Sequence, residues 1–127
     1  MSTAYTIGEW SSAEGVITSE GLMRPLIATS NISVTALEIA PGDEVLPHKH
    51  PSLPYFEVIF YILEGTLEVI VEMERFPAKT GSAIMASPYD IGWANRTDTL
   101  VKALILHAPS PAWKSAREFL ERIRSRT

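Results

Sequence analysis

The chain has 127 residues, enough for one domain with a hydrophobic core and too few for two ordinary domains. Its composition, 46% hydrophobic and 20% charged, is that of an average globular protein and excludes global disorder. Residues 1–113 carry 6 basic and 13 acidic side chains, which argues against nucleic acid as a partner.

The absence of cysteine excludes disulfides, thiolate metal ligands and cysteine nucleophiles, and it suits a reducing compartment. The longest wholly apolar run, residues 58–63, is too short to cross a bilayer. Residues 1–10 lack the basic start and apolar core of a secretion signal. We therefore expect a cytoplasmic location and no membrane partner.

The first part of the chain predicts strands separated by tight turns. Residues 1–21 hold three glycines among short apolar pieces, which indicates an N-terminal arm with one short strand. Residues 22–28 and 32–40 favour two longer strands. The turn-prone residues 29–31 separate them.

A Pro-Gly-Asp turn at residues 41–43 leads into a short predicted strand at residues 44–50. This segment contains His48 and His50. Successive side chains of a strand leave opposite faces, so two imidazoles two positions apart can reach one point. That is the geometry that a metal ion needs. Pro47 within the segment and Pro51 after it indicate a sheet edge or rim.

Two strands with different burial are predicted next. Residues 57–64, EVIFYILE, contain six consecutive apolar residues and end at Gly65, which indicates a buried strand and a turn. Residues 66–74 alternate between apolar residues, up to Met73, and glutamates. This pattern predicts a half-buried strand with a solvated glutamate face, followed by a hairpin turn at residues 74–75.

The remaining strands are short. Residues 82–86 predict one strand, and residues 91–95 and 99–107 predict a hairpin about residues 96–98. With turns at such regular intervals and no helical pattern between them, the strands indicate an antiparallel sandwich or barrel.

Only the end of the chain predicts a helix. Ser110 is a good N-cap, and Pro111 suits the first helical position. Five apolar residues then share one helical face: Trp113, Ala116, Phe119, Leu120 and Ile123. We expect the Trp113 side of this helix to pack on the barrel or on a neighbouring subunit.

The spacing of these residues resembles that of a small single-domain cupin. In the family's first motif five residues separate a glycine from His-x-His, and a second glycine ends the motif; Gly42, His48, His50 and Gly65 match these positions. The resemblance implies an all-β double-stranded β-helix (cupin) barrel, usually a homodimer, with a site inside the barrel near one end. It divides the chain into an arm (1–21), a cupin barrel (22–109) and a C-terminal α-helix (110–127).

The sequence departs from the family pattern at two ligand positions. In the family pattern six residues separate the glutamate from the closing glycine, which puts Val58 at its position in this chain, and Glu57 is one position early. The second motif has lost its histidine: anchoring on Asn95 puts Ile91 at that position, and anchoring on Gly81 puts Gly92 there.

Four residues are therefore candidate metal ligands. His48 and His50 could bind a divalent first-row metal (Fe, Mn, Ni, Cu or Zn), or they could be family relics that only form hydrogen bonds. Glu57 is a ligand only if a bulge or a longer rim loop turns it inward, and otherwise it is an exposed strand carboxylate. His107 is expected on the inner face of its strand, as a substitute ligand or as a core histidine.

The predicted hairpin would bring His107 near Ser87 and Pro88, beside the position of the missing ligand. Four further residues could line the barrel mouth or be rim packing: Tyr55, Tyr89, Asp90 and Trp93.

Two hypotheses of function follow. The first is a small cupin-domain protein that binds a divalent transition metal through His48 and His50. It would be a metal-dependent enzyme of oxygenase or isomerase type acting on a small oxygenated molecule. The second is a metal-free binding module or sensor for a small apolar organic ligand. A metal-free acid/base isomerase or cyclase lies between the two.

Overall fold

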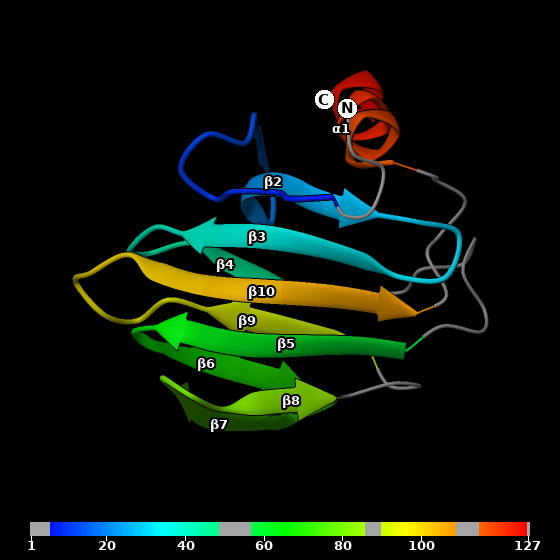
Figure 1. The fold of residues 1–127 in the computed structure, drawn as a ribbon. Helices are drawn as coiled ribbons and strands as arrows, with labels where there is room; N and C mark the ends of the chain where they lie inside the picture. The colour runs from blue at the N-terminus through cyan, green and yellow to red at the C-terminus, as the bar shows by residue number, and fades with distance from the viewer. Residues whose placement is uncertain (1–5, 49–56, 86–89, 109–114, 127) are drawn as a thin grey trace.

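The computed structural model describes residues 6–48, 57–85, 90–108 and 115–126, and in these residues two antiparallel sheets face each other (Figure 1). Sheet A has the strand order β1-β2-β3-β10-β5-β8, and sheet B the order β4-β9-β6-β7. The strands are β1 (Val16–Thr18), β2 (Gly21–Ala28), β3 (Ser33–Ile39), β4 (Glu44–His48), β5 (Glu57–Glu64), β6 (Thr66–Val71), β7 (Glu74–Lys79), β8 (Ala83–Met85), β9 (Ile91–Ala94) and β10 (Val101–Ala108), and the helix is α1 (Ala116–Arg126). The predicted all-β architecture with a C-terminal helix is confirmed.

The core fills the space between the two sheets. Each strand alternates, so that every second side chain points inward and is removed from water. Phe60 of sheet A and Trp93 of sheet B meet there, with their ring centroids 4.9 Å apart. The main inward residues are Leu37, Ile39, Phe60, Ile62, Leu67, Val69, Trp93, Val101, Ala103 and Ile105.

The predicted strand at residues 66–74 is too long. β6 ends at Val71, and the turn consists of Glu72 and Met73, after which β7 pairs back with β6. Glu72 has a φ of 55°, and Met73 is 95% exposed. The alternation was misleading because Met73 continues the apolar period although it lies in the turn.

The predicted hairpin of residues 91–107 is wrong. β9 pairs with β4 and β6 in sheet B, whereas β10 pairs with β3 and β5 in sheet A. The loop between them crosses from one sheet to the other. Asn95 holds this crossing, because its buried Nδ2 donates to the carbonyl oxygens of Ile39 (2.9 Å) and Thr99 (2.8 Å).

In the described residues the helix begins at Ala116. Ser115 is its N-cap, since its Oγ accepts the N–H of Glu118 at 3.1 Å. The predicted cap at Ser110 and the residues Pro111 and Trp113 lie outside the described residues. Three predicted apolar positions are buried, Phe119, Leu120 and Ile123, and the helix packs beside β1 and β2 as expected for a barrel contact.

The segment before β1 lies across β2. Arg24 donates from Nε to Glu38 (2.7 Å) and from Nη1 to the carbonyl of Ala13 (2.7 Å), and Trp10 Nε1 donates to Glu38 (3.1 Å). Burial raises the pKa of Glu38, but the hydrogen bonds from Arg24 and Trp10 outweigh it and hold that pKa below its usual value. The carboxylate therefore stays charged and fixes this segment to sheet A.

Candidate metal site at one end of the barrel

Several strand ends that carry candidate residues meet at one end of the barrel. Strand β4 ends there with His48, β5 begins there with Glu57, and β10 reaches the same end with His107 (Figure 1). Strand β9 begins there with Ile91. His50 lies outside the described residues, as do Tyr55 and Tyr89.

His107 lies on the inner face of sheet A, as the alternation predicted. It follows the buried residues Ala103 and Ile105 on that face and is itself half-buried. Its cross-strand partners are Ser33 of β3 and Val58 of β5. Ser33 is fully buried, and its Oγ lies 3.5 Å from Nδ1 of His107, at the limit of hydrogen bonding.

These neighbours of His107 differ from those that we expected. The hairpin that would have brought it near Ser87 and Pro88 does not form, and those two residues lie outside the described ones. Sequence reasoning missed Ser33, because only the pairing of β3 with β10 places a serine beside the histidine.

Glu57 lies on the outer face of sheet A. It pairs with Ala108, and both residues are exposed, whereas the next pair, Val58 and His107, faces the core. The register shift between β5 and β10 lies at the far end of the strands, beside Lys102 and Ala103, so no bulge turns Glu57 inward. The inner position near His107 therefore belongs to Val58.

Strand β4 carries a bulge immediately before His48. Val45 pairs with Trp93, and His48 pairs with Ile91, so β4 uses one residue more than β9 over this stretch. Ile91 packs against the core, and it also pairs with Val71 of β6. The apolar side chain of Ile91 therefore occupies the position that the family's second motif, anchored on Asn95, gives to a histidine.

The other two residues that were candidates for the barrel mouth, Asp90 and Trp93, lie in different environments. Asp90 lies half-buried just before β9. Trp93 is only 2% exposed and packs on Phe60, so it belongs to the core and not to the rim. Within the described residues, no group of three or more His, Cys, Asp or Glu side chains could hold a metal ion.

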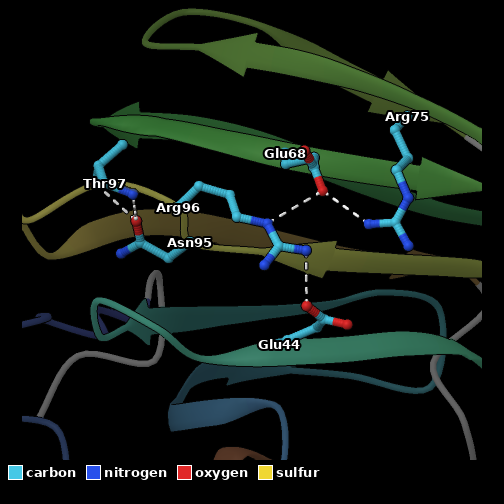
Figure 2. Close-up of polar contacts among 6 residues, drawn as sticks. All are labelled: Glu44, Glu68, Arg75, Asn95, Arg96 and Thr97. Atoms are coloured by element: carbon cyan, nitrogen blue, oxygen red, sulfur yellow. Dashed lines mark hydrogen bonds and ion pairs between the residues drawn. The ribbon is translucent and has the colours of Figure 1, made fainter.

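The charged side chains Glu44, Glu68, Arg75 and Arg96 gather on sheet B. Figure 2 shows Arg96 between Glu44 (2.8 Å) and Glu68 (3.4 Å), with Arg75 on the other side of Glu68 (2.9 Å). The hydrogen bond from Arg75, together with the nearby charge of Arg96, holds the pKa of Glu68 below its usual value. A shallow hollow of about 220 Å³ adjoins these residues. Its charges are paired, which suits a solvated surface better than a catalytic cluster.

The helix α1, in the part of the chain that the structure describes, is not long and apolar enough to span a membrane.

Comparison with solved structures identifies many chains of the same fold. KdgF from Halomonas sp. superposes with a TM-score of 0.74 at 15% identity, covering 86% of this chain and 97% of that chain. An RmlC-like cupin from Shewanella frigidimarina gives 0.72 at 16% identity, covering 86% and 95%. A predicted oxalate decarboxylase from Thermotoga maritima gives 0.72 at 19% identity, covering 83% and 100%.

At these identities the similarity establishes the fold and not a shared activity. No curated protein sequence matches the chain significantly. A family model described as "Cupin domain" matches residues 36–107, which is more than half of the chain. These residues run from within β3 to within β10 and include His48. The chain belongs to the cupin domain family.

Proposed function

We propose that this cupin domain binds a divalent transition metal through His48 and His50, with His107 as a third ligand. The observation that supports the proposal most is the inward position of His107 at the barrel end where β4 ends in His48. His50 would complete the set from the residues that follow β4.

The donor set fits a metal that prefers imidazole. Val58 pairs with His107 and Ile91 pairs with the backbone of His48, both are apolar, and Glu57 faces outward. Without a carboxylate, an imidazole set favours Fe, Ni, Cu or Zn over Mn, which prefers oxygen ligands. A bound metal of this kind would act as a Lewis acid that polarises an oxygen of a small molecule.

The surrounding residues would position such a molecule. Val58 and Ile91 supply an apolar wall beside the histidines, which limits the access of water. Ser33, buried beside His107, would restrict the orientation of the imidazole ring. The finer proposal is a metal-dependent enzyme of oxygenase or isomerase type for a small oxygenated substrate, working in the cytoplasm.

The test is metal retention by purified protein after loading with each metal, measured by mass spectrometry of the metal and by thermal shift. We expect one metal ion per chain, its loss in His48→Ala, and an affinity lowered at least about tenfold in His107→Ala. Glu57→Gln is the matched control and should retain the metal. Protein that binds no metal after loading discards the proposal, and loss of metal in Glu57→Gln contradicts the ligand set.

A second function is favoured by Val58 and Ile91 themselves. Two apolar side chains at positions where the family pattern has ligands make this end of the barrel suitable for a small apolar organic molecule without a metal. Thermal shift distinguishes the two functions. Stabilisation by organic ligands but not by metal salts, with the same result in His48→Ala, would support the binding module or sensor.

A further inference from the structure

Strand β3 carries two hydroxyl side chains, Ser33 and Thr35, on the inner face of sheet A. β3 lies between β2 and β10 within this sheet (Figure 1). Both residues alternate in step with Leu37, which belongs to the core, so their side chains point inward. Each of them is 0% exposed. The inner face of sheet A therefore holds two hydroxyl groups that bulk water does not reach.

The two hydroxyls differ in their partners. Oγ of Ser33 lies 3.5 Å from Nδ1 of His107. Oγ1 of Thr35 is buried and, among the described residues, has no hydrogen-bond partner. Buried polar groups in native proteins are nearly always paired, and an unpaired one lowers stability. A hydroxyl that persists in this state is a candidate for a hydrogen bond to a ligand.

The strand register arranges the inward side chains around these hydroxyls in two rows. The row at the end of the barrel consists of Ala28, Ser33, His107 and Val58, and the next row inward consists of Pro25, Thr35, Ile105 and Phe60. Successive inward positions on a strand are two residues apart, which corresponds to roughly 7 Å. Thr35 is thus the one hydroxyl of an otherwise apolar row, one step deeper in the barrel than His107.

The pairing of β2 with β3 is irregular directly beside Thr35. Thr35 pairs with Pro25, which has no N–H to donate, and the register shifts between Pro25 and Ile27. Such irregularities are frequent next to active sites, where they change the direction of a side chain. The interrupted ladder and the unpaired hydroxyl therefore mark the same position independently of each other.

The charge of the two rows restricts the kind of ligand. They contain no Asp, Glu, Lys or Arg, and Arg24 and Glu38 of the same two strands bond to each other on the outer face. An ionic group that loses its water requires an opposite charge nearby. A hydroxyl or carbonyl oxygen requires only a hydrogen bond, which a threonine hydroxyl can supply. The two rows therefore suit an uncharged, oxygen-containing molecule.

We propose that Thr35 is a ligand-binding residue whose hydroxyl forms a hydrogen bond with an oxygen of a small uncharged alcohol or carbonyl compound. Ser33, one row nearer to the barrel end, would contact a second oxygen of the same molecule. Because Thr35 is fully covered, the ligand displaces side chains over it when it binds. The location of this site rests on the proposed function, and its chemistry narrows the small oxygenated substrate to an uncharged one.

The first experiment compares three ketones of nearly the same size by isothermal titration calorimetry. Dihydroxyacetone is uncharged, diethyl ketone has a methyl group in place of each hydroxyl, and hydroxypyruvate has a carboxylate in place of one hydroxymethyl group. On chelator-treated protein, dihydroxyacetone should bind at least about tenfold tighter than the other two ketones, since only it can pair the buried hydroxyls without bringing in a charge. Dihydroxyacetone is also titrated into zinc-loaded protein.

Binding of dihydroxyacetone in neither form, or binding no tighter than that of diethyl ketone, overturns the proposal. This comparison uses the unaltered chain, so it decides the matter even if a variant does not fold.

The second experiment separates a role of Thr35 in binding from a role in the fold. Thr35→Val removes the hydroxyl and keeps the shape of the side chain. It should weaken dihydroxyacetone binding about tenfold, reduce the preference over diethyl ketone, and raise the midpoint of urea unfolding. Thr35→Ser is the matched control: it keeps the hydroxyl, so it should retain the affinity within about threefold although its unfolding midpoint falls.

Stability and affinity thus change in opposite directions in both variants, which a threonine with a structural role alone would not produce. Unchanged dihydroxyacetone affinity in Thr35→Val overturns the proposal. Zinc binding by the unaltered chain keeps the two proposals distinguishable. If zinc binds but no ketone binding depends on Thr35, only the role of Thr35 is wrong. If ketone binding depends on Thr35 but no metal binds, only the metal site is wrong.

Discussion

Asn95 illustrates how a polar side chain in a family motif can serve the fold alone. It is 1% exposed, and its Nδ2 donates to two carbonyl oxygens while its Oδ1 accepts from the N–H and the hydroxyl of Thr97 (3.0 and 2.6 Å). Both the nitrogen and the oxygen of the side-chain amide therefore have two hydrogen-bond partners each. Asn95 thereby fixes the path from β9 to β10 and is not available to a substrate.

Thr35 presents the opposite situation, and it yields a prediction about stability. Its Oγ1 is buried without a hydrogen-bond partner in the described structure. Removing an unpaired buried hydroxyl while keeping the shape of the side chain recovers its desolvation cost, so Thr35→Val should stabilise the fold by about 1 kcal/mol. Urea unfolding measures this difference.

Thr35→Ser is the control for that measurement, because it keeps the hydroxyl and loses a methyl group. It should destabilise the protein by about 1 kcal/mol through the lost burial. A Thr35→Val protein that is less stable than the unaltered one would show that the hydroxyl has a partner after all.

The directions of His107 and Glu57 differ in how far the sequence alone predicts them. The inward position of His107 followed from alternation along its own strand, because a period of two is a local property. The direction of Glu57 stayed open, since it depended on whether a bulge lies near it. Only the pairing with Ala108 settled that point.

At the scale of elements, the contact of β4 with β9 depends on Gly92. A Cβ at this position would collide with the carbonyl oxygen of Val45 and would lie 2.6 Å from the backbone nitrogen of Pro47. Both atoms belong to the bulged part of β4, whose next residue is His48. The absence of a side chain at Gly92 therefore permits the close approach that positions the end of β4.

We predict that Gly92→Ala displaces β4, lowers stability by roughly 1–3 kcal/mol, and weakens metal binding together with it. Calorimetric metal titration and urea unfolding of the same variant measure both effects. Gly81→Ala is the control: it has a φ of 90° but no neighbouring atom within 4 Å, so it should cost about 1 kcal/mol and leave metal affinity unchanged. If Gly92→Ala leaves metal affinity unchanged, the position of β4 does not determine metal binding, and this prediction is wrong.

The strand pairings were harder to predict than the strands. The composition of residues 22–28, 57–64 and 99–107 predicts strands that the structure contains, but the hairpin that the sequence predicts for residues 91–107 is wrong, because these residues cross between sheets. A short loop is compatible with either connection. The two connections differ in the partners of the strands: β9 pairs with β4 and β6, and β10 pairs with β3 and β5, which all lie far away in sequence.

At the scale of the whole molecule, the two sheets are joined through one core. Phe60 is 3% exposed and meets Trp93 across the sheets. We predict that Phe60→Ala costs about 3–5 kcal/mol and that fluorescence and circular dichroism report the same unfolding transition. Met73→Ala, exposed on a turn, should change stability by less than about 0.5 kcal/mol. Two separate transitions would contradict a single cooperative core.

The two outer faces give the molecule its asymmetry. The outer face of sheet B carries paired charges that water solvates, and the outer face of β5 and β8 in sheet A carries the exposed apolar side chains Tyr61, Leu63 and Met85. This division is invisible along any single strand. It becomes apparent only when β10, β5 and β8 are placed side by side.

The sequence by itself determined the all-β class, most strand positions, the cupin motif around His48 and His50, and the inward position of His107. These depend on local periodicity and spacing, which a strand imposes wherever it lies. Only the tertiary structure decided that Val58 lies beside His107, that Ile91 packs against the core, that Glu57 faces outward, and that β9 and β10 belong to different sheets. Those features depend on register between distant strands, which is set by packing of the whole core and has no signal within one segment.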